Sequence, residues 1–421
     1  MASSAIAAPA ASTTPTSSLK RSPAAGGALR PEQPPLHQAR RVPALAWPPV
    51  PRLAAAAPSP RRAVAAPATA GTPGHLNPAE LLEVALKAAE AGAEVRERER
   101  GRPLSCVHSR ARPLPLAPRR PTLTLKKKKS ISPRPPPVPP PHHLPQVVRA
   151  ALDKPRTITF KGATDLVTET DGASEAAVLD VLRGAYPGHA ILGEEGGVSG
   201  DTASDYLWCV DPLDGTTNFA HGYPSFAVSV AVLRRAVPVA GVVIEFAGGP
   251  GAWVTKTYAA ARNGGATLNG APISVSRTAD VTRSLLVTGF GYEHDAAWEA
   301  NLKLFRHFTD VSQGVRRLGA ASVDMCHVAL GVVDAYWEYR LKPWDVAAGV
   351  LIVEEAGGRV STMDGLPYSV FQRSVLVSND ALHEALLEKT DAATAGLREA
   401  GVDLSPWFVP DGYGVHTGAQ L

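Results

Sequence analysis

The stretch VDPLDGTTNFAHGYPSFAVSVAV (210–232) decides how the rest of the chain is interpreted. It follows the apolar run YLWC (206–209), so we expect a strand that ends in an acidic turn. Asp211 and Asp214 flank a Pro-Leu turn, which lets both carboxylates converge with the Leu213 carbonyl on one point. This turn is therefore a candidate for cation binding.

The residues after the turn add a phosphate-binding pattern and two strands. GTTN (215–218) offers free backbone N–H groups, which can bind a phosphate if a helix begins there. FAVSVAVL (226–233) and VPVAGVVIEF (237–246) are short, mainly apolar runs that predict a pair of strands.

Three further segments place acids at strand ends or turns: TDLVTETD (164–171), LGEEGG (192–197) and KPWDVAAG (342–349). Carboxylates and carbonyls without a His or Cys cluster describe a site for a hard cation, Mg²⁺ above all. Two such ions about 4 Å apart would hold the attacking and leaving oxygens of an in-line phosphoryl displacement. Crowded carboxylates repel one another, and a bound cation relieves that repulsion. The four acidic segments together predict a magnesium site for phosphoryl chemistry.

Each acidic segment also has a simpler interpretation. Asp-Pro-x-Asp-Gly is usually a turn, and GEEGG is usually a solvated loop. Asp345 would serve as the cap of the helix that follows it. Only the combination of segments favours a catalytic site.

The remaining pattern predicts interleaved helices and strands. Helices are expected at 174–186, 320–339 and 345–358, and strands at 189–195 and 206–215. Since no regular βαβ rhythm appears, we expect a layered α/β or α+β sandwich rather than a doubly wound sheet. The three cysteines, Cys106, Cys209 and Cys326, form no disulfide or CxxC metal pattern, and the latter two are expected in the core.

Charge is distributed unevenly along the 421 residues, whose net charge is +4. Residues 1–74 carry +7 and residues 96–146 carry +11, which leaves −14 for the rest. The folded part is thus acidic, which argues against a body that binds nucleic acid. No apolar window approaches the ~18 residues of a membrane span, so we expect no membrane partner either.

Residues 1–74 are rich in Ala, Ser, Thr, Pro and Arg and contain one acid, Glu32. This composition is typical of a chloroplast transit peptide, which predicts a stromal protein. A disordered low-complexity tail is the alternative.

Residues 95–146 interrupt a helix. NPAELLEVALKAAEAGAEV (77–95) begins one, and VVRAALDKP (147–155) looks like its last two turns. The segment between them contains thirteen prolines and thirteen cationic side chains, so it can neither be helical nor bury a core. The segment is a whole number of codons long. Its Val-Arg start can encode a splice donor, and its final Gln can encode a splice acceptor. These features predict a retained intron within a domain that spans 75–421. A nucleic-acid patch or a polyproline ligand is the functional alternative.

Taken together, DLVTETD, LGEEGG, VDPLDGTTNFAHGYPSFAVSVAV and KPWDVAAGVLIVEEAGG resemble the inositol monophosphatase family of lithium-sensitive, Mg²⁺-dependent phosphatases. The resemblance covers 77–421 apart from 95–146. The N-terminal extension and the tail LREAGVDLSPWFVPDGY look like those of plastid-targeted plant members. The resemblance to this family implies an α-β-α-β-α layered sandwich, a homodimer and hydrolysis of myo-inositol monophosphate.

The resemblance also implies a set of two to three Mg²⁺ ions. Glu194, Asp211 and the Leu213 carbonyl would bind the first ion. Asp211 would bridge to a second ion, completed by Asp214 and Asp345. The last of the metal-site residues, Asp171, would hold a third ion through water together with Glu194.

Catalytic and substrate-binding roles follow from the same resemblance. Thr216, near Asp171, would orient the attacking water and help deprotonate it, and the amides of Gly215 and Thr216 would bind phosphate oxygens. Glu338, seven residues before Asp345, would meet substrate hydroxyls. The sugar-alcohol pocket would be lined by Gly319, Ala320 and Ala321. Arg340 stands where many relatives have a small residue, which bears on substrate preference.

The expected partner is therefore a small phosphorylated polyol. Alternatives with the same metal site are L-galactose 1-phosphate, histidinol phosphate and nucleotide or sugar bisphosphates, although NFAHGYPSFAVSVAV (218–232) favours the monophosphatases. The alternative from another class is a non-catalytic plastid interaction protein that keeps the fold.

Overall fold

The computed structural model describes residues 76–93, 147–152, 158–160 and 166–414 of the chain. All of them belong to one unit, which runs from residue 71 to residue 421. The expected transit segment (1–74) and the expected insertion (95–146) lie outside the described residues.

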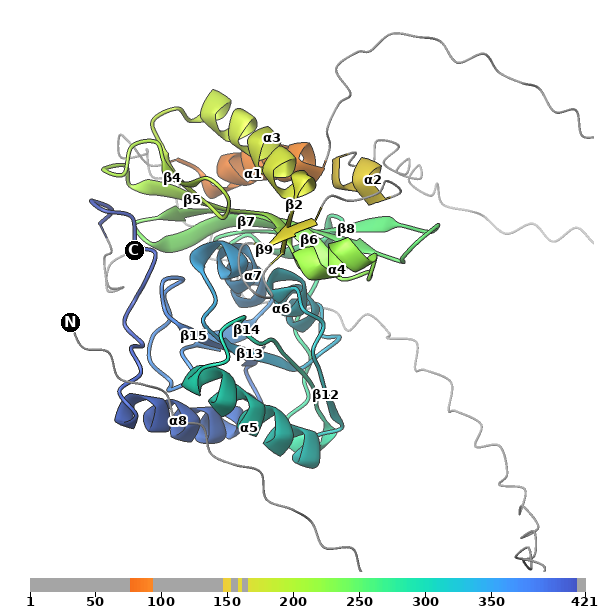
Figure 1. Ribbon diagram of the computed structural model, residues 1–421, viewed down its shortest axis with the longest axis vertical. Helices are drawn as coiled ribbons and strands as arrows, with labels where there is room; N and C mark the ends of the chain where they lie inside the picture. The colour runs from red at the N-terminus through yellow and green to blue at the C-terminus, as the bar shows by residue number, and fades with distance from the viewer. Residues whose placement is uncertain (1–75, 94–146, 153–157, 161–165, 415–421) are drawn as a thin grey trace, which may run out of the picture. The chain divides into compact units, whose positions relative to one another are not determined.

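Helices and sheets alternate in five layers (Figure 1). Helices α1 and α3 cover one face of an eight-stranded sheet, and α6 and α7 lie between that sheet and a five-stranded one. Helices α5 and α8 pack on the other face of the smaller sheet. The predicted α-β-α-β-α sandwich is confirmed. The helices are α1 (Pro78–Ala93), α2 (Val147–Leu152), α3 (Glu169–Ala185), α4 (Thr216–His221), α5 (Ala296–Val311), α6 (Ala321–Ala329), α7 (Pro343–Glu355), α8 (His383–Glu399) and a 3₁₀ turn, η1 (Val281–Arg283).

The large sheet has the strand order β10-β9-β8-β7-β6-β5-β3-β4, and the small one β12-β11-β13-β15-β14. A separate antiparallel pair joins β1 (Ile158–Phe160) to β2 (Leu166–Thr168). The strands of the large sheet are β3 (Ala190–Gly193), β4 (Gly197–Ser199), β5 (Tyr206–Asp214), β6 (Phe226–Arg234), β7 (Val237–Ala247), β8 (Val254–Ala261), β9 (Gly265–Leu268) and β10 (Ala271–Pro272). Those of the small sheet are β11 (Leu285–Thr288), β12 (Gly314–Arg316), β13 (Ala335–Tyr339), β14 (Gly358–Ser361) and β15 (Ser374–Asn379).

Strand β5 carries a bulge at the DPLD sequence (211–214), and this bulge explains how both aspartates reach one pocket. Residues three apart in a regular strand point to opposite faces. Asp211 pairs with Ser229, but Asp214 pairs with Ala227, so β5 has one more residue than β6 across this interval. The extra residue lets both aspartates line the same pocket.

The two stretches that were predicted to be parts of one helix each contain a helix. The Asn77 side chain accepts a hydrogen bond from the Ala79 amide at 3.0 Å, so Asn77 caps the start of α1. The buried residues of α1, which include Leu81, Ala85 and Ala88, pack on the large sheet. α2 begins at Val147 and packs against α1 and α3. Residues 78–93 and 147–152 of the two predicted helical stretches are therefore helical.

One helix prediction was wrong. The stretch 320–339 contains helix α6 only as far as Ala329, and its last five residues form strand β13. Gly331 adopts a φ of 74°, which ends the helical path and favours glycine. Three of the five residues AYWEY are aromatic β-formers, and the stretch pairs with β11 and β15, which outweighs the helical pattern.

Two helices begin earlier than predicted. The helix expected from residue 174 begins at Glu169, because the Thr168 side chain caps it and Asp171 bonds back to the Thr168 amide. The helix expected from residue 345 begins at Pro343, whose fixed φ suits a first turn. In both cases an acid predicted as a metal ligand lies in the first helical turn.

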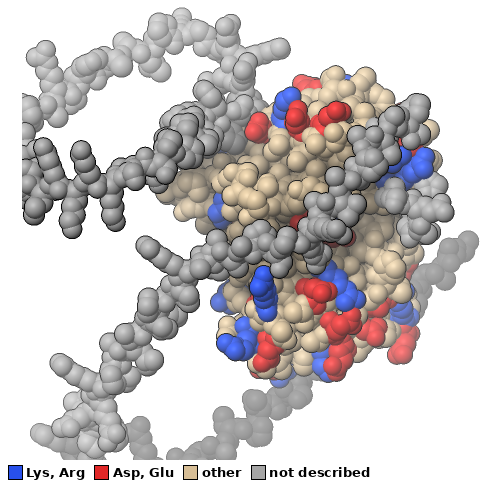
Figure 2. Space-filling view, turned by 180° about the vertical axis from the view of Figure 1, so that it is seen from behind, with Lys and Arg blue, Asp and Glu red and all other residues tan. Residues whose placement is uncertain are grey.

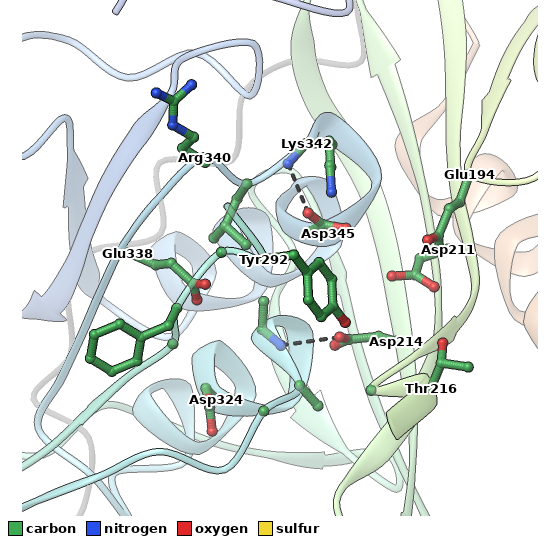
Figure 3. A pocket seen from close by; sticks show the side chains of 18 of the residues that line it. Glu194, Asp211, Asp214, Thr216, Tyr292, Asp324, Glu338, Arg340, Lys342 and Asp345 are labelled. Carbon is green, nitrogen blue, oxygen red and sulfur yellow. Dashed lines mark hydrogen bonds between the residues drawn. The ribbon is translucent and has the colours of Figure 1, made fainter. Parts of the chain in front are cut away.

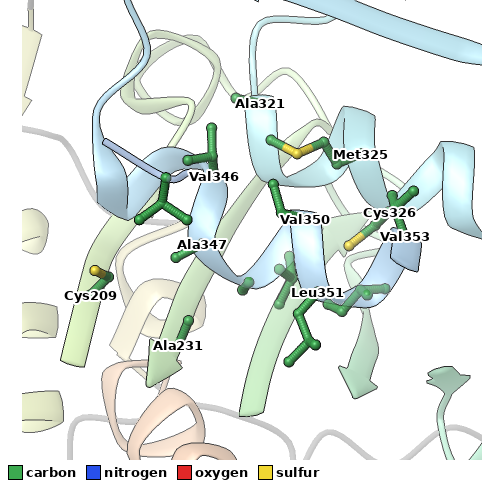
Figure 4. Packing of buried hydrophobic residues seen from close by; sticks show 14 of the residues in the cluster. Cys209, Ala231, Ala321, Met325, Cys326, Val346, Ala347, Val350, Leu351 and Val353 are labelled. Carbon is green, nitrogen blue, oxygen red and sulfur yellow. The ribbon is translucent and has the colours of Figure 1, made fainter. Parts of the chain in front are cut away.

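The main core lies around α7, as Figure 4 shows. Its residues from Val346 to Val353 are all buried between the two sheets. A Cβ on Gly349 would come within 2.9 Å of the Met325 Cβ, so glycine permits the close approach of α6. Cys209 and Cys326 are 1% and 0% exposed, which confirms their predicted place in the core.

The face seen in Figure 2 carries interspersed acidic and basic side chains. No helix among residues 76–93, 147–152 and 166–414 is long and apolar enough to cross a membrane.

Candidate active site

One pocket collects nearly all of the predicted site residues (Figure 3). It lies where the ends of β5 and β13 meet the N-terminal ends of α4, α6 and α7. The predicted residues that line it are Glu194, Asp211, Leu213, Asp214, Gly215, Thr216, Gly319, Ala320, Ala321, Glu338 and Asp345. Asp171 is the exception, since it lies behind the wall and contacts the pocket through Thr216.

The β5 bulge holds two buried carboxylates in the pocket wall. Asp211 is 2% exposed, and its Oδ1 accepts a hydrogen bond from the Leu213 amide at 3.0 Å. Burial raises the pKa of Asp211 well above its ordinary value, and the carboxylates of Glu194, Asp214 and Asp345 raise it further. Asp211 therefore lies at the centre of a cluster of like charges.

Asp214 is bonded to the first turn of α6. Its two oxygens accept the Ala321 amide at 3.1 Å and the Ser322 amide at 2.7 Å, and the Ser322 hydroxyl donates at 2.6 Å. Burial nevertheless raises the pKa of Asp214 to about 6, since the desolvation exceeds the effect of these bonds. The bonds also connect the large sheet to the Gly319–Ala321 turn.

Asp345 lies at the start of α7, where its Oδ2 accepts the Lys342 amide at 2.7 Å. Among the described residues, no three His, Cys, Asp or Glu side chains lie close enough to hold one ion. The donor set nevertheless fits Mg²⁺, because it consists of carboxylate and carbonyl oxygens. Mutual repulsion that raises the pKa of buried acids is also what a divalent cation would relieve.

Thr216 and Asp171 form the pair that the sequence predicts. The Thr216 Oγ1 lies 3.1 Å from the Asp171 Oδ1 and 3.0 Å from the Leu213 carbonyl oxygen. The other oxygen of Asp171 accepts the amide and the hydroxyl of Thr168 at 2.8 and 2.5 Å. Burial raises the pKa of Asp171, which is 0% exposed. The arrangement can orient a hydroxyl group toward the pocket.

Helix α4 begins at the position that the GTTN pattern predicts. Gly215 has a φ of 83°, a conformation that favours glycine, and a Cβ there would lie 3.0 Å from the Ser225 carbonyl oxygen. The Asn218 side chain donates to the carbonyls of Ser225 and Leu318, both at 2.7 Å. Asn218 therefore holds α4 against the turn that precedes α6.

The opposite wall of the pocket is built around Glu338 on β13. Glu338 is 6% exposed, and it accepts the Tyr336 hydroxyl at 2.5 Å. Burial raises its pKa to about 8, with a further contribution from the carboxylate of Asp345. A Cβ on Gly289 would lie 1.9 Å from the Glu338 Oε2, so this wall requires glycine at that position.

Several residues of this wall were missed from the sequence. Asp324 on α6 is 1% exposed, and its Oδ1 has no hydrogen-bond partner. Its position three residues after Ala321 places it on the same helix face, which is a signal that could have found it. Tyr292 and Arg317 also line the pocket, but nothing in their local sequence indicates this. Lys342 lines it too, at the start of the KPWDVAAG segment.

Arg340, noted for its departure from the family pattern, also lines the pocket. Its backbone adopts a φ of 68°, and its guanidinium forms an ion pair with Asp295. The strained backbone conformation is held by the Arg340 amide, which donates to the Arg373 carbonyl at 2.7 Å.

Comparison with known proteins identifies relatives of this chain. The model of the inositol monophosphatase family matches residues 143–395. The chain is 65% identical over 268 residues to "Phosphatase IMPL1, chloroplastic" of Arabidopsis thaliana, which covers 64% of this chain and 72% of that protein. It is 42% identical over 236 residues to "Nus factor SuhB" of Pseudomonas aeruginosa, which covers 55% of this chain and 84% of that protein.

A solved structure gives the same result. The inositol monophosphatase from Anabaena (Nostoc) superimposes with a TM-score of 0.51 at 41% sequence identity and covers 58% of this chain and 88% of that one. The fold, the matched segment and the relatives agree. The chain belongs to the inositol monophosphatase family and is a phosphatase enzyme.

Proposed function

We propose that the protein is a Mg²⁺-dependent phosphomonoesterase that hydrolyses myo-inositol monophosphate to myo-inositol and phosphate. The observation that carries this proposal is the β5 bulge. It brings Asp211, the Leu213 carbonyl and Asp214 into one pocket with Glu194 and the hydroxyl of Thr216. Oxygen donors beside a helix N-terminus suit a cation and a phosphate together.

The residues that would hold the metal ions follow the assignments from sequence. Glu194, Asp211 and the Leu213 carbonyl would hold one ion, and Asp211, Asp214 and Asp345 a second. Asp171 would support a third ion through water. Bound Mg²⁺ would neutralise phosphate charge and assist the attack on phosphorus as a Lewis acid.

The chain's own groups would do the remaining work. The Thr216 hydroxyl, with Asp171 behind it, would orient the attacking water and accept its proton through this pair. The backbone amides of Gly215 and Thr216 would bind phosphate oxygens at the start of α4. Binding the phosphate in line with the water would lower the barrier mainly through positioning.

A small polyol suits the rest of the pocket. With its pKa raised to about 8, Glu338 is largely protonated at neutral pH and can both donate to and accept from a hydroxyl group. The Gly319–Ala321 turn leaves space beside it, since these residues carry small side chains. L-galactose 1-phosphate, histidinol phosphate and sugar or nucleotide bisphosphates are the alternative substrates.

A substrate panel tests this proposal. Phosphate release should be measured from each of these monoesters with Mg²⁺, with and without Li⁺. We expect myo-inositol 1-phosphate to be hydrolysed fastest and Li⁺ to inhibit. Absence of turnover of every monoester at saturating Mg²⁺ would overturn the proposal.

A role as an interaction protein is the second candidate, because one relative carries the name Nus factor. The presence of the full acidic set in one pocket counts against a purely non-catalytic role. Rescue of a null mutant separates the two. Wild type and an Asp211→Asn variant would rescue equally if interaction alone mattered.

We propose that residues 1–74 direct the protein to the chloroplast stroma, where a homodimer would form. The composition of this segment and the chloroplastic relative support the targeting. A fluorescent fusion of residues 1–74 should accumulate in the stroma. Light scattering of the purified protein should give twice the mass of one chain.

Residues 95–146 are, in our proposal, a retained intron. Support comes from the two helices on either side, α1 and α2, which pack together. Spliced transcripts that all keep these codons would contradict the proposal. If the segment is translated, its deletion tests whether it affects the enzyme: equal melting temperature and activity would show that it is a harmless loop.

A further inference from the structure

Helix α3 presents a polar stripe to the loops of the active site. Asp171, Ser174, Glu175 and Val178 follow the i, i+3, i+4, i+7 spacing of one helix face. All four are buried, with exposed fractions of 0%, 0%, 6% and 0%. Buried polar groups are costly unless they are bonded, so each of the three polar residues needs a partner.

Two of these partners lie in the segment that contains the β5 bulge. Asp171 accepts the Thr216 hydroxyl at 3.1 Å. The Ser174 hydroxyl donates to the Pro212 carbonyl at 2.8 Å, inside the DPLD sequence itself. α3 therefore fixes this segment at two points.

The third residue, Glu175, contacts a different loop. Its Oε1 accepts a hydrogen bond from the Glu195 amide at 3.1 Å. A Cβ on Gly193 would lie 2.2 Å from that oxygen, and a Cβ on Gly196 would lie 3.0 Å from the Oε2. The two glycines let the loop wrap closely around the carboxylate, with Glu194 between them.

Helix α1 packs against this polar stripe of α3. A Cβ on Gly92 would lie 2.6 Å from the Val178 Cγ2 and 2.9 Å from the Ser174 Oγ, so the two helices are in close contact. The side chains of the stripe therefore have little room to move. A residue of the stripe can hold the active-site loop that it contacts in a fixed position.

We propose that Glu175 is a positioning residue of the active site. From α3 it fixes the backbone on both sides of Glu194, so that the Glu194 carboxylate faces the same point as Asp211. The stripe would thereby align two loops that are separate in the sequence. The role rests on the proposed function, because it is defined by the binding of Mg²⁺ at Glu194.

The main test compares three variants of the full chain: Glu175→Ala, Glu175→Gln and the matched control Asp180→Asn, an exposed acid on the same helix. Mg²⁺ affinity is measured by calorimetry without substrate, and kcat and KM are measured separately. We expect Glu175→Ala to weaken Mg²⁺ binding by about 10–100-fold, as loss of a supporting group does. Glu175→Gln should remain within about threefold of wild type, since its amide oxygen can still accept the Glu195 N–H. Asp180→Asn should be unchanged.

A double-mutant cycle tests the contact itself, independently of metal. Gly193→Ala should lower the melting temperature in the wild-type background, because its methyl group collides with Glu175. In the Glu175→Ala background the same change should have much less effect.

The outcomes separate the two proposals. If wild type binds Mg²⁺ and Glu175→Ala binds it equally well, the positioning role is wrong and the proposed function stands. A lower melting temperature with unchanged Mg²⁺ affinity also overturns it, since that describes a structural residue only. If wild type binds no Mg²⁺ and releases no phosphate, the proposed function fails, and the positioning role fails with it.

Discussion

The two ends of the pocket are built in different ways. At one end, Asp211, Asp214 and Thr216 follow one another within six residues, and the β5 bulge and the start of α4 fix their directions. At the other end, Glu338 and Asp324 come from β13 and α6, and their environment depends on residues far away in the chain. The first end, the proposed phosphate end, takes these residues from one short segment that α3 and α6 hold in place. The second, the proposed hydroxyl end, is assembled from remote segments by tertiary packing alone. Substitutions at the two ends should therefore affect different quantities: mainly kcat at the first end and mainly KM at the second.

The largest effect is expected at the centre of the phosphate end. Asp211→Asn keeps the shape of the side chain but removes the charge shared between two proposed ion sites, so we expect kcat to fall by about 10³-fold. The melting temperature without metal should stay equal or rise, because burial and its neighbours oppose ionisation of Asp211. Steady-state kinetics and thermal unfolding check both parts. Activity within tenfold of wild type would show that the cation does not bind there.

Substitutions of Thr216 test whether the pair formed by Thr216 and Asp171 takes part in proton transfer. Thr216→Ala should lower kcat by about 10²–10³-fold with little change in KM, since it removes the hydroxyl beside Asp171. Thr216→Ser retains the hydroxyl and is the control, expected within about tenfold of wild type. If Ala and Ser behave alike, the hydroxyl has no part in the reaction.

Glu338 tests the hydroxyl end. Its pKa of about 8 means that glutamine mimics the form present at neutral pH, so Glu338→Gln should change KM by less than about fivefold. Glu338→Ala removes the bonding group and should raise KM about tenfold with a smaller effect on kcat. Equal damage by Gln and Ala would show that the ionised carboxylate is required.

Metal binding should depend on pH through the phosphate end. The pKa of Asp214 is about 6 in the fold against an ordinary 3.8, so the folded state holds more protons than the unfolded state between these values. The metal-free protein should therefore lose stability as the pH rises through this window. Mg²⁺ requires the ionised carboxylates, so its thermal stabilisation should be larger at pH 8 than at pH 5.5, by about a few degrees. A shift that is equal at both pH values would contradict the proposed ligands.

The smallest effect on stability is expected for Arg340→Gly. Glycine adopts the left-handed conformation of residue 340 without the strain that a side chain causes, which stabilises the fold by about 1–2 kcal/mol. The loss of the partly exposed ion pair with Asp295 costs up to about 1 kcal/mol. The melting temperature should thus change by only about a few degrees. The relative rates on different monophosphates should change instead, since Arg340 lines the pocket. An unchanged substrate profile would remove Arg340 from specificity.

The same contrast explains what the sequence could predict. The acidic segments are local patterns, and the structure brings three of them to one pocket: LGEEGG, VDPLDGTTNF and KPWDVAAG. The fourth, TDLVTETD, contacts the pocket through the bond between Asp171 and Thr216. Strand β13 was taken for helix because its pairing partners are remote in the chain. Tyr292 and Arg317 were missed because only packing places them in the pocket wall, whereas the helical spacing of Asp324 from Ala321 could have revealed Asp324. The need for glycine at 289 could not be seen until Glu338 was placed beside it.

The most direct test of the account is a Mg²⁺ titration of metal-free full-length protein with myo-inositol 1-phosphate, measuring phosphate release. The account predicts no release without Mg²⁺, release that rises and saturates as Mg²⁺ is added, and a loss of about 10³-fold in Asp211→Asn. An equal rate in the presence of a chelator, or no release at any Mg²⁺ concentration, would contradict it.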